Sequence, residues 1–166
     1  MRKLLIGGIV AGIVLGLVAC GNDAADPVAE QARQQSDYWQ IDQIEKDFHG
    51  AMTTKDIDRM MSLFAPNATM TVGPGVTATG LDEIRAFWLT KAAPFAAENH
   101  WVSDHPAYKL EITVAGDRGT LHFECHYVDY DNSRVDVATV ADMDVARIEG
   151  RWLITNFAAG STELRP

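Results

Sequence analysis

The spacing of hydrophobic and polar positions divides the chain into a helical first half and a strand-rich second half. Hydrophobic residues at Ile41, Ile44, Phe48 and Met52 recur every three or four positions, with charged residues between them. This period predicts an amphipathic helix. Ser36 precedes the pattern and is expected to cap the helix, because its hydroxyl accepts hydrogen bonds from unpaired N–H groups of a first turn.

Two shorter helices and two short strands are predicted after this helix. Asp56 is expected to begin the second helix. Hydrophobic and threonine-rich segments at 68–72 and 76–78 predict two strands, because a Gly-Pro-Gly turn separates them. Residues 79–82 resemble a capping box with Asp in place of the usual Glu, which predicts a third helix that ends near Pro94.

After residue 100 the chain consists of long β-rich stretches. The stretches cover residues 101–114, 118–130, 134–148 and 151–159. The breaks between them are short enough for hairpins, so the strands are expected to form an antiparallel meander. Helices followed by such a meander predict an α+β fold class.

The N-terminal segment has the pattern of a secretion signal. Arg2 and Lys3 precede an uncharged run that is shorter than the roughly 20 residues of a membrane-spanning helix. A basic start and a short apolar run are typical of a signal peptide. The run ends in Leu17-Val18-Ala19-Cys20, which resembles the bacterial lipobox. This resemblance implies that Cys20 is acylated, becomes the new N-terminus and anchors the protein to a lipid bilayer.

This signal divides the chain into three parts. Residues 1–19 are predicted to be a lipoprotein signal peptide, 20–35 a lipidated tether or weak helix, and 36–166 a single domain. The protein is expected in the cell envelope. Gly21, rather than Asp, follows Cys20, which favours the outer membrane facing the periplasm if the host has two membranes.

Charge and cysteine content exclude several classes of protein. The formal net charge is -9, and no Lys/Arg cluster is present, which argues against nucleic-acid binding. The same acidity makes attachment of the domain itself to anionic lipids unfavourable, so membrane attachment depends on Cys20. Cys125 is the other cysteine, so no disulfide is possible within the mature chain once Cys20 is acylated, and Cys125 is interpreted as a small buried residue.

Three motifs, in their order and spacing, resemble the SnoaL-like branch of the nuclear transport factor 2-like superfamily. They lie at residues 54–68, 79–88 and 149–154, and the resemblance covers about 40–160. It implies a cone in which three helices pack on a strongly curved antiparallel sheet and leave a pocket at the open end. The superfamily includes isomerases, dehydratases, hydrolases, cyclases and non-catalytic binding domains, so the resemblance predicts fold more closely than function.

Two pairs of residues are candidates for acid–base chemistry. His100 and Asp104 are four apart on one predicted strand, and Asp142 and Asp144 are two apart on another, so each pair shares a face. The resemblance implies that His100 and Asp104 point into the pocket and that Asp144 corresponds to a pocket acid of isomerase and cyclase relatives. A carboxylate buried among apolar walls has a raised pKa, which suits a general acid. The alternative is that both aspartates are solvated at a strand edge.

Other positions favour binding over catalysis. The resemblance places Phe48 and Val72 where steroid isomerases have a catalytic Tyr and a base Asp, so that chemistry is excluded. Four aromatic residues are expected to rim a ligand pocket instead: Tyr38, Trp39, Trp88 and Trp101. The leading hypothesis is therefore a pocket for a small, mainly apolar ligand.

A further histidine cluster is expected on the outside of the sheet. Its members, His122, Glu124 and His126, alternate with four hydrophobic residues, and these hydrophobic residues are expected to occupy the buried face. The cluster is expected to face solvent or a second subunit, and neither a metal nor a cofactor is predicted. His49 and His105 are interpreted as surface or edge histidines. Three functions remain open: ligand binding, an acid–base enzyme using His100 and Asp144, and an interaction module that forms a homodimer through its sheet.

Overall fold

The computed structural model describes residues 26–103 and 107–164. The predicted signal peptide, Cys20 and Asp104 lie outside these residues. The elements, in chain order, are α1 (Pro27–Thr54), α2 (Ile57–Met61), β1 (Phe64–Val72), β2 (Val76–Thr79), α3 (Gly80–Thr90), the 3-10 helix η1 (Ala93–Phe95), β3 (Trp101–Ser103), β4 (Lys109–Ala115), β5 (Arg118–Asp129), β6 (Arg134–Ile148) and β7 (Arg151–Glu163). The predicted α+β class is confirmed.

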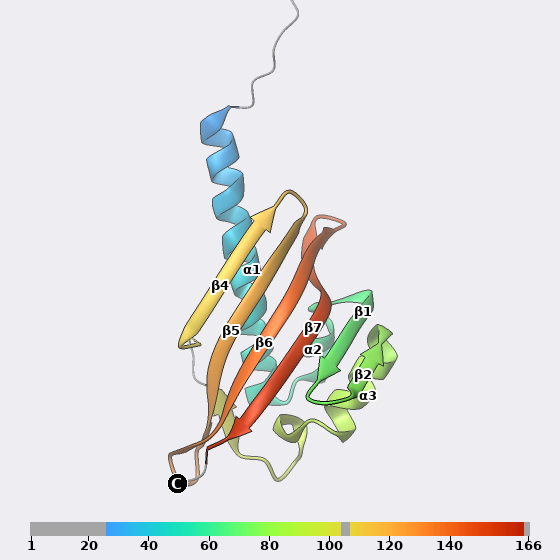
Figure 1. Cartoon of the computed structure of the whole chain (residues 1–166), viewed down its shortest axis with the longest axis vertical. Helices are drawn as coiled ribbons and strands as arrows, with labels where there is room; N and C mark the ends of the chain where they lie inside the picture. Colours follow the sequence, from blue (N-terminus) through green and yellow to red (C-terminus); the bar gives the residue numbers. More distant parts are fainter. Residues whose placement is uncertain (1–25, 104–106, 165–166) are drawn as a thin grey trace, which may run out of the picture.

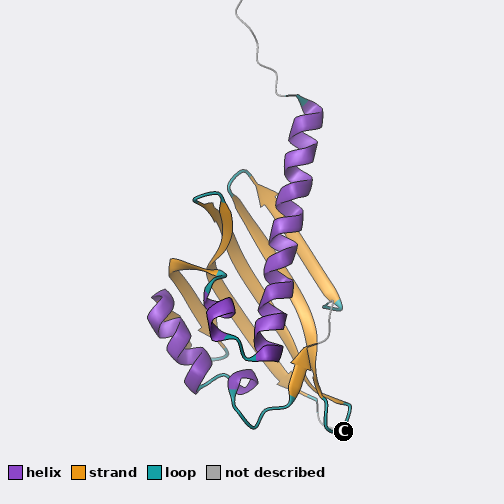
Figure 2. Cartoon of the chain, turned by 180° about the vertical axis from the view of Figure 1, so that it is seen from behind, coloured by secondary structure: helices purple, strands orange, loops and turns teal. Residues whose placement is uncertain are grey.

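The strands form one curved sheet that does not close into a barrel. Its order is β2-β1-β7-β6-β5-β3, and β4 also pairs with β5 (Figure 1). Strands β4 to β7 form the predicted antiparallel meander. Strand β1 joins the free edge of β7 in parallel. The helices cover one face of the sheet (Figure 2).

Helix α1 is longer than the sequence pattern predicts. It begins at Pro27, and the carboxylate of Asp26 caps it by accepting a hydrogen bond from the Val28 N–H at 2.9 Å. The prediction that Ser36 caps this helix is wrong, because Asp26 and the fixed φ of Pro27 start it nearly three turns earlier. The first turns are exposed and project beyond the sheet (Figure 1), and the helix first buries a side chain at Asp37.

The N-termini of the other two helices differ in how they are capped. The carboxylate of Asp56 caps α2 as predicted, accepting from the Arg59 N–H at 3.0 Å. At α3 the carboxylate of Glu83, not Asp82, accepts from the Thr79 N–H at 2.8 Å. The predicted capping box is wrong because Gly80 has a left-handed φ of 77°, whereas a capping box needs helical φ at that position.

The hydrophobic core lies between α1 and the inner face of β5, β6 and β7. The predicted helix stripe, Ile41, Ile44, Phe48 and Met52, is buried. The inner face of the sheet contributes Leu121, Phe123, Cys125, Tyr127, Ala141, Met143, Val145, Ile154 and Phe157. Cys125 is buried in this core, as the sequence indicates. The period-two burial of β5 and β6 fixes which side chains reach the space under the helices.

Candidate functional site

A cavity of about 320 Å³ lies between the helices and the inner face of the sheet. Aromatic residues form a large part of its walls, and they come from helices and strands alike: Phe48, Phe87, Trp88, Trp101, Phe123, Tyr127 and Phe157. Lys91, Ala93 and Ser161 also line the cavity, and they are exposed. These three residues therefore mark the mouth, where the cavity meets solvent.

The aromatic walls are held by contacts between rings. Trp88 meets Phe48 edge to face at 5.6 Å between ring centroids and lies 6.1 Å from Phe157. Trp101 stacks on Tyr127 at 5.6 Å. Such contacts fix the rings beyond the effect of burial alone. These contacts give the cavity well-packed aromatic walls.

Few polar atoms reach the cavity. The Tyr127 hydroxyl donates to the Met52 sulfur at 2.9 Å, and Lys91 is at the mouth. Within the described residues, the indole N–H of Trp88 and the hydroxyl of Thr139 are buried without a hydrogen-bond partner. None of the described lining residues is Asp, Glu or His. The described walls therefore contain no carboxylate or imidazole for acid–base chemistry.

Two of the four predicted aromatic ligand residues lie at the cavity. Trp88 and Trp101 line it, whereas Tyr38 and Trp39 are exposed on α1. Tyr38 lies ten residues before Phe48, the first cavity residue of α1, which corresponds to about 15 Å along a helix axis. Tyr38 and Trp39 are therefore too far along the helix to rim this cavity.

His100 lies outside the cavity. It immediately precedes β3, and because Trp101 faces the cavity, the alternation of an extended chain directs the preceding side chain elsewhere. Its Nδ1 contacts the carboxylate of Asp131, and its ring stacks on Tyr130 at 5.0 Å. Its predicted neighbour Asp104 is outside the described residues.

Asp142 and Asp144 share one face, as predicted, but it is the outer face of the sheet. Their neighbours on β6, Ala141 and Met143, occupy the buried face. Asp142 bonds to Nδ1 of His122 at 2.8 Å, and Asp144 accepts from the side-chain amide of Asn156 at 3.3 Å. The sheet thus separates both aspartates from the cavity, and the structure brings neither of them together with His100.

Comparison with known proteins identifies the family. Residues 33–158 match the family model described as the SnoaL-like domain. The chain belongs to the SnoaL-like domain family. None of the curated proteins matches the sequence of this SnoaL-like domain protein.

Solved structures share the fold of this SnoaL-like domain at low sequence identity. An NTF2-like protein with a cystatin-like fold from Novosphingobium aromaticivorans is 16% identical, with a TM-score of 0.68 over 84% of this chain and 91% of its own. The hexachlorocyclohexane dehydrochlorinase LinA-type3 from Novosphingobium barchaimii LL02 is 14% identical, with a TM-score of 0.67 over 81% of this chain and 94% of its own. At such identity these similarities show the fold alone.

The outer sheet face of the SnoaL-like domain carries the predicted histidine cluster. Glu124 accepts from the Lys109 ammonium at 2.8 Å and from the Tyr108 hydroxyl at 2.7 Å, and these bonds lower the pKa of Glu124 to about 2. The hydrogen bond to Asp142 raises the pKa of His122, with a smaller contribution from Glu124. In the described part of the chain, no group of three His, Cys, Asp or Glu side chains is arranged to hold a metal ion.

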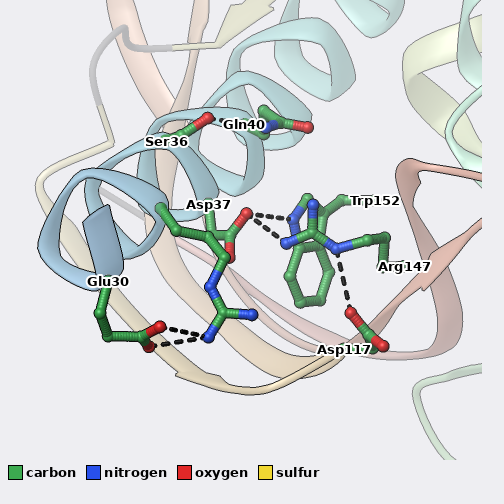
Figure 3. A network of polar contacts seen from close by, with 8 residues as sticks. Glu30, Ser36, Asp37, Gln40, Asp117, Arg147 and Trp152 are labelled. Carbon is green, nitrogen blue, oxygen red and sulfur yellow. Dashed lines mark hydrogen bonds and ion pairs between the residues drawn. The ribbon is translucent and has the colours of Figure 1, made fainter. Parts of the chain in front are cut away.

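A buried polar network joins α1 to the sheet of the SnoaL-like domain (Figure 3). Asp37 is only 4% exposed, and its carboxylate accepts from the Arg147 guanidinium and from the Trp152 indole at 3.3 Å. Arg147 also lies over the Trp152 ring at 5.0 Å and donates to the exposed Asp117 at 3.1 Å. Sequence analysis missed this network, although Asp37 stands four residues before Ile41, on the buried side of the helix.

A second buried polar pair lies further along α1. His49 Nδ1 is 2.8 Å from the Glu45 carboxylate, which also accepts from the Ala107 N–H at 3.3 Å. The interpretation of His49 as a surface histidine is wrong, because its ring packs edge to face against Phe123 at 4.8 Å between centroids and is 2% exposed. This pair connects α1 to the chain that leads into β4, and neither residue lines the cavity.

Proposed function

We propose that this SnoaL-like domain binds a small, largely apolar molecule in the cavity between its helices and its sheet. The observation that carries the proposal is the lining of the cavity, which is mostly aromatic and aliphatic and has its exposed residues gathered at one mouth. Ligand pockets of proteins are typically concave, apolar and of about 300–1,000 Å³, a range that includes this cavity.

The apolar walls also favour binding energetically. A molecule that buries about 200 Å² of apolar surface gains about 5 kcal/mol at 25 cal/mol per Å². Part of this gain offsets the loss of translational and rotational freedom on association. Because the rings already pack against one another, little further ordering is required of the protein.

Binding is favoured over acid–base catalysis by the position of the titratable groups. Among the described lining residues, only Lys91 and Tyr127 carry a titratable side chain, and Lys91 is exposed at the mouth. His100 and Asp144, the base and acid of the enzymatic alternative, lie outside the cavity. The open cavity likewise argues against a module that acts only through its outer sheet.

The binding proposal is tested by filling the cavity. Ala159 on β7 lines the cavity, so Ala159→Leu is expected to weaken binding of naphthalene at least tenfold, measured by titration calorimetry. Ala158→Leu is the matched control, since the adjacent residue faces the outer side of the sheet, where it pairs with Asp142. Equal affinities of the two variants, or no binding by the wild type, would contradict the proposal.

We also propose that the domain is anchored by acylated Cys20 in the cell envelope, on the outer membrane facing the periplasm in a host with two membranes. The support is the signal-like segment that ends at Cys20. No helix among the described residues has the length and hydropathy needed to span a bilayer. The N-terminus of α1 and the η1 segment beside the mouth lie at opposite ends of the domain (Figure 1).

The anchor is tested by removing the acylated thiol. Cys20→Ala is expected to move the protein from the membrane pellet to the soluble fraction and to abolish labelling by a fatty-acid probe. Cys125→Ala is the control, because this buried cysteine lies in the core and should leave the anchor intact. A Cys20→Ala protein that still pellets with membranes without an acyl label would contradict the anchor.

A further inference from the structure

One segment of the chain forms one side of the cavity mouth. Residues 91–99 lead from α3 towards β3 and include the 3-10 helix η1. Four residues at the start of this segment line the cavity: Lys91, Ala92, Ala93 and Pro94. Lys91 and Ala93 are exposed at the mouth, so a molecule that enters the cavity passes along this segment. We call residues 91–99 the mouth segment.

The backbone of the mouth segment is bonded mainly to itself. In the described part of the chain, the N–H groups of Phe95, Ala96 and Asn99 each donate to a carbonyl three residues earlier, at 3.0–3.1 Å. These short-range turns do not tie the segment to the sheet. The Phe95 ring packs against Trp88 at 5.7 Å between ring centroids. A segment with so few bonds to its surroundings separates from them more readily than the core strands do.

A lysine at the end of α1 supplies a polar connection to the mouth segment. The Lys55 ammonium donates to three backbone carbonyls of the segment: Pro94 at 3.1 Å, Ala96 at 2.6 Å and Asn99 at 2.9 Å. An ammonium has three N–H donors, so all three are used on this one segment. Hydrogen bonds from a charged donor are stronger than those between neutral groups. Lys55 therefore holds the mouth segment beside the C-terminal end of α1 (Figure 2).

The backbone conformation of Lys55 is unusual for a residue with a side chain. Lys55 ends α1 with a left-handed φ of 57°, and its N–H donates to the carbonyl of Met52 at 3.2 Å. Glycine is the usual residue at such a helix end, because an L side chain is strained there. Ordering a long lysine side chain also costs entropy. The three bonds to the mouth segment offset both costs, which indicates that this position serves the segment.

Resting on the proposed function, we infer that the mouth segment is the gate of the cavity and that Lys55 holds the gate closed. Release of the three carbonyls allows the segment to move away from α1, so that an apolar molecule can pass, and the same bonds close the gate again. Lys55 is not among the described residues that line the cavity. It therefore controls the rates at which a ligand enters and leaves, and has little effect on the affinity, because the closed gate is favoured equally with and without ligand.

The inference is tested by measuring the two rate constants of binding separately. N-phenyl-1-naphthylamine is a neutral apolar dye whose emission rises when it leaves water, so stopped-flow fluorescence gives both rate constants. Lys55→Met keeps the length of the side chain but removes its three bonds. We expect the association and dissociation rate constants both to rise about tenfold, while Kd changes less than about twofold.

Lys91→Met is the matched control for the charge. It removes the cation that lines the mouth but leaves the three bonds of Lys55 in place, so both rate constants should stay within about twofold of the wild type. Lys55→Gly covers failure of the first variant to fold, because glycine suits the left-handed end of α1. It should open the gate as Lys55→Met does.

The outcomes separate this inference from the proposed function. A raised Kd with an unchanged association rate constant in both Lys55 variants would mean that Lys55 only shapes the wall. That result, unchanged rate constants, or an equal rise in Lys91→Met would overturn the gate and leave binding in the cavity intact. A wild type that binds neither the dye nor naphthalene would overturn both.

Discussion

At the residue scale, Asp37 is a charged residue whose side chain is buried. Its carboxylate neutralises Arg147 and accepts from the indole of Trp152, so three elements depend on one buried group. A buried charge without its partner is far more costly than an exposed one. Asp37 therefore holds α1 against the sheet strands β6 and β7 (Figure 3).

The first prediction concerns the two carboxylates that share the Arg147 guanidinium. Asp37→Ala is expected to lower the free energy of unfolding by about 2–4 kcal/mol, because it leaves Arg147 and the Trp152 N–H without a buried acceptor. Asp117→Ala removes the exposed partner and should cost less than about 0.5 kcal/mol. Urea unfolding measures both, and equal costs would contradict this account of the network.

The second prediction is a pH dependence of stability from the outer face. The pKa of His122 is raised by its bond to Asp142, so its contribution is full below about 6.5 and is lost as pH rises through the raised pKa. The pKa of Glu124 is lowered to about 2 by Lys109 and Tyr108, so its contribution is full above about 4.5 and is lost on acidification toward 2. The cluster is therefore most stabilising between about pH 4.5 and 6.5.

Urea unfolding at pH 6 and pH 9 tests the histidine. Asp142→Asn should reduce the loss of stability between these two pH values, because it removes the main cause of the raised pKa of His122. Asp144→Asn is the control, since Asp144 bonds Asn156 on the same face instead of a histidine. An unchanged difference between pH 6 and pH 9 in Asp142→Asn would refute the assignment.

The residue scale also shows what the sequence reveals about the site. Alternation along a strand predicts that Asp142 and Asp144 share a face, and they do. The alternation does not say which face of the sheet the two aspartates share, because that depends on whether Ala141 and Met143 are the residues buried in the core. The sequence predicts Trp88 at the pocket, but the rings that pack against it come from α1, α3, η1 and β7, and no local pattern reveals that arrangement.

At the element scale, α1 shows why the hydrophobic period of a sequence can miss part of a helix. Its first turns are exposed on all sides, so no hydrophobic period marks them. Local chemistry stabilises them instead: Asp26 caps the helix, Pro27 fixes its first φ, and Glu30 pairs with Arg33 at 2.6 Å. The antiparallel meander is easier to predict, because its turn residues and the period-two alternation of its strands indicate the same structure.

The third prediction concerns the close approach of β4 and α1 to Gly119 on β5. A Cβ atom there would lie 2.5 Å from the backbone oxygen of Thr113 and 3.3 Å from the Ile41 side chain. Gly119→Ala is therefore expected to cost about 2 kcal/mol of unfolding free energy. Gly160→Ala is the matched control on β7, where the added Cβ would meet Val140 at an ordinary 3.8 Å. A Gly119→Ala protein as stable as Gly160→Ala would contradict this close approach at Gly119.

At the scale of the whole molecule, the order of elements predicted the fold but not the use of the cavity. Helices before a meander, with the three family-like motifs, indicated a cone, and the family match over residues 33–158 confirms the family. The parallel pairing of β1 with β7 came from the tertiary fold, because no local signal specifies which edge an early strand joins. The cavity itself depends on side chains from both halves of the chain.

The fourth prediction is the most direct test of the central claim, that the cavity holds a small apolar molecule. It is a crystal structure of the protein grown with naphthalene. The account predicts electron density for the ring inside the cavity, against Phe48, Trp88 and Trp101. An empty cavity, or naphthalene bound only on the outer face of the sheet, would contradict it.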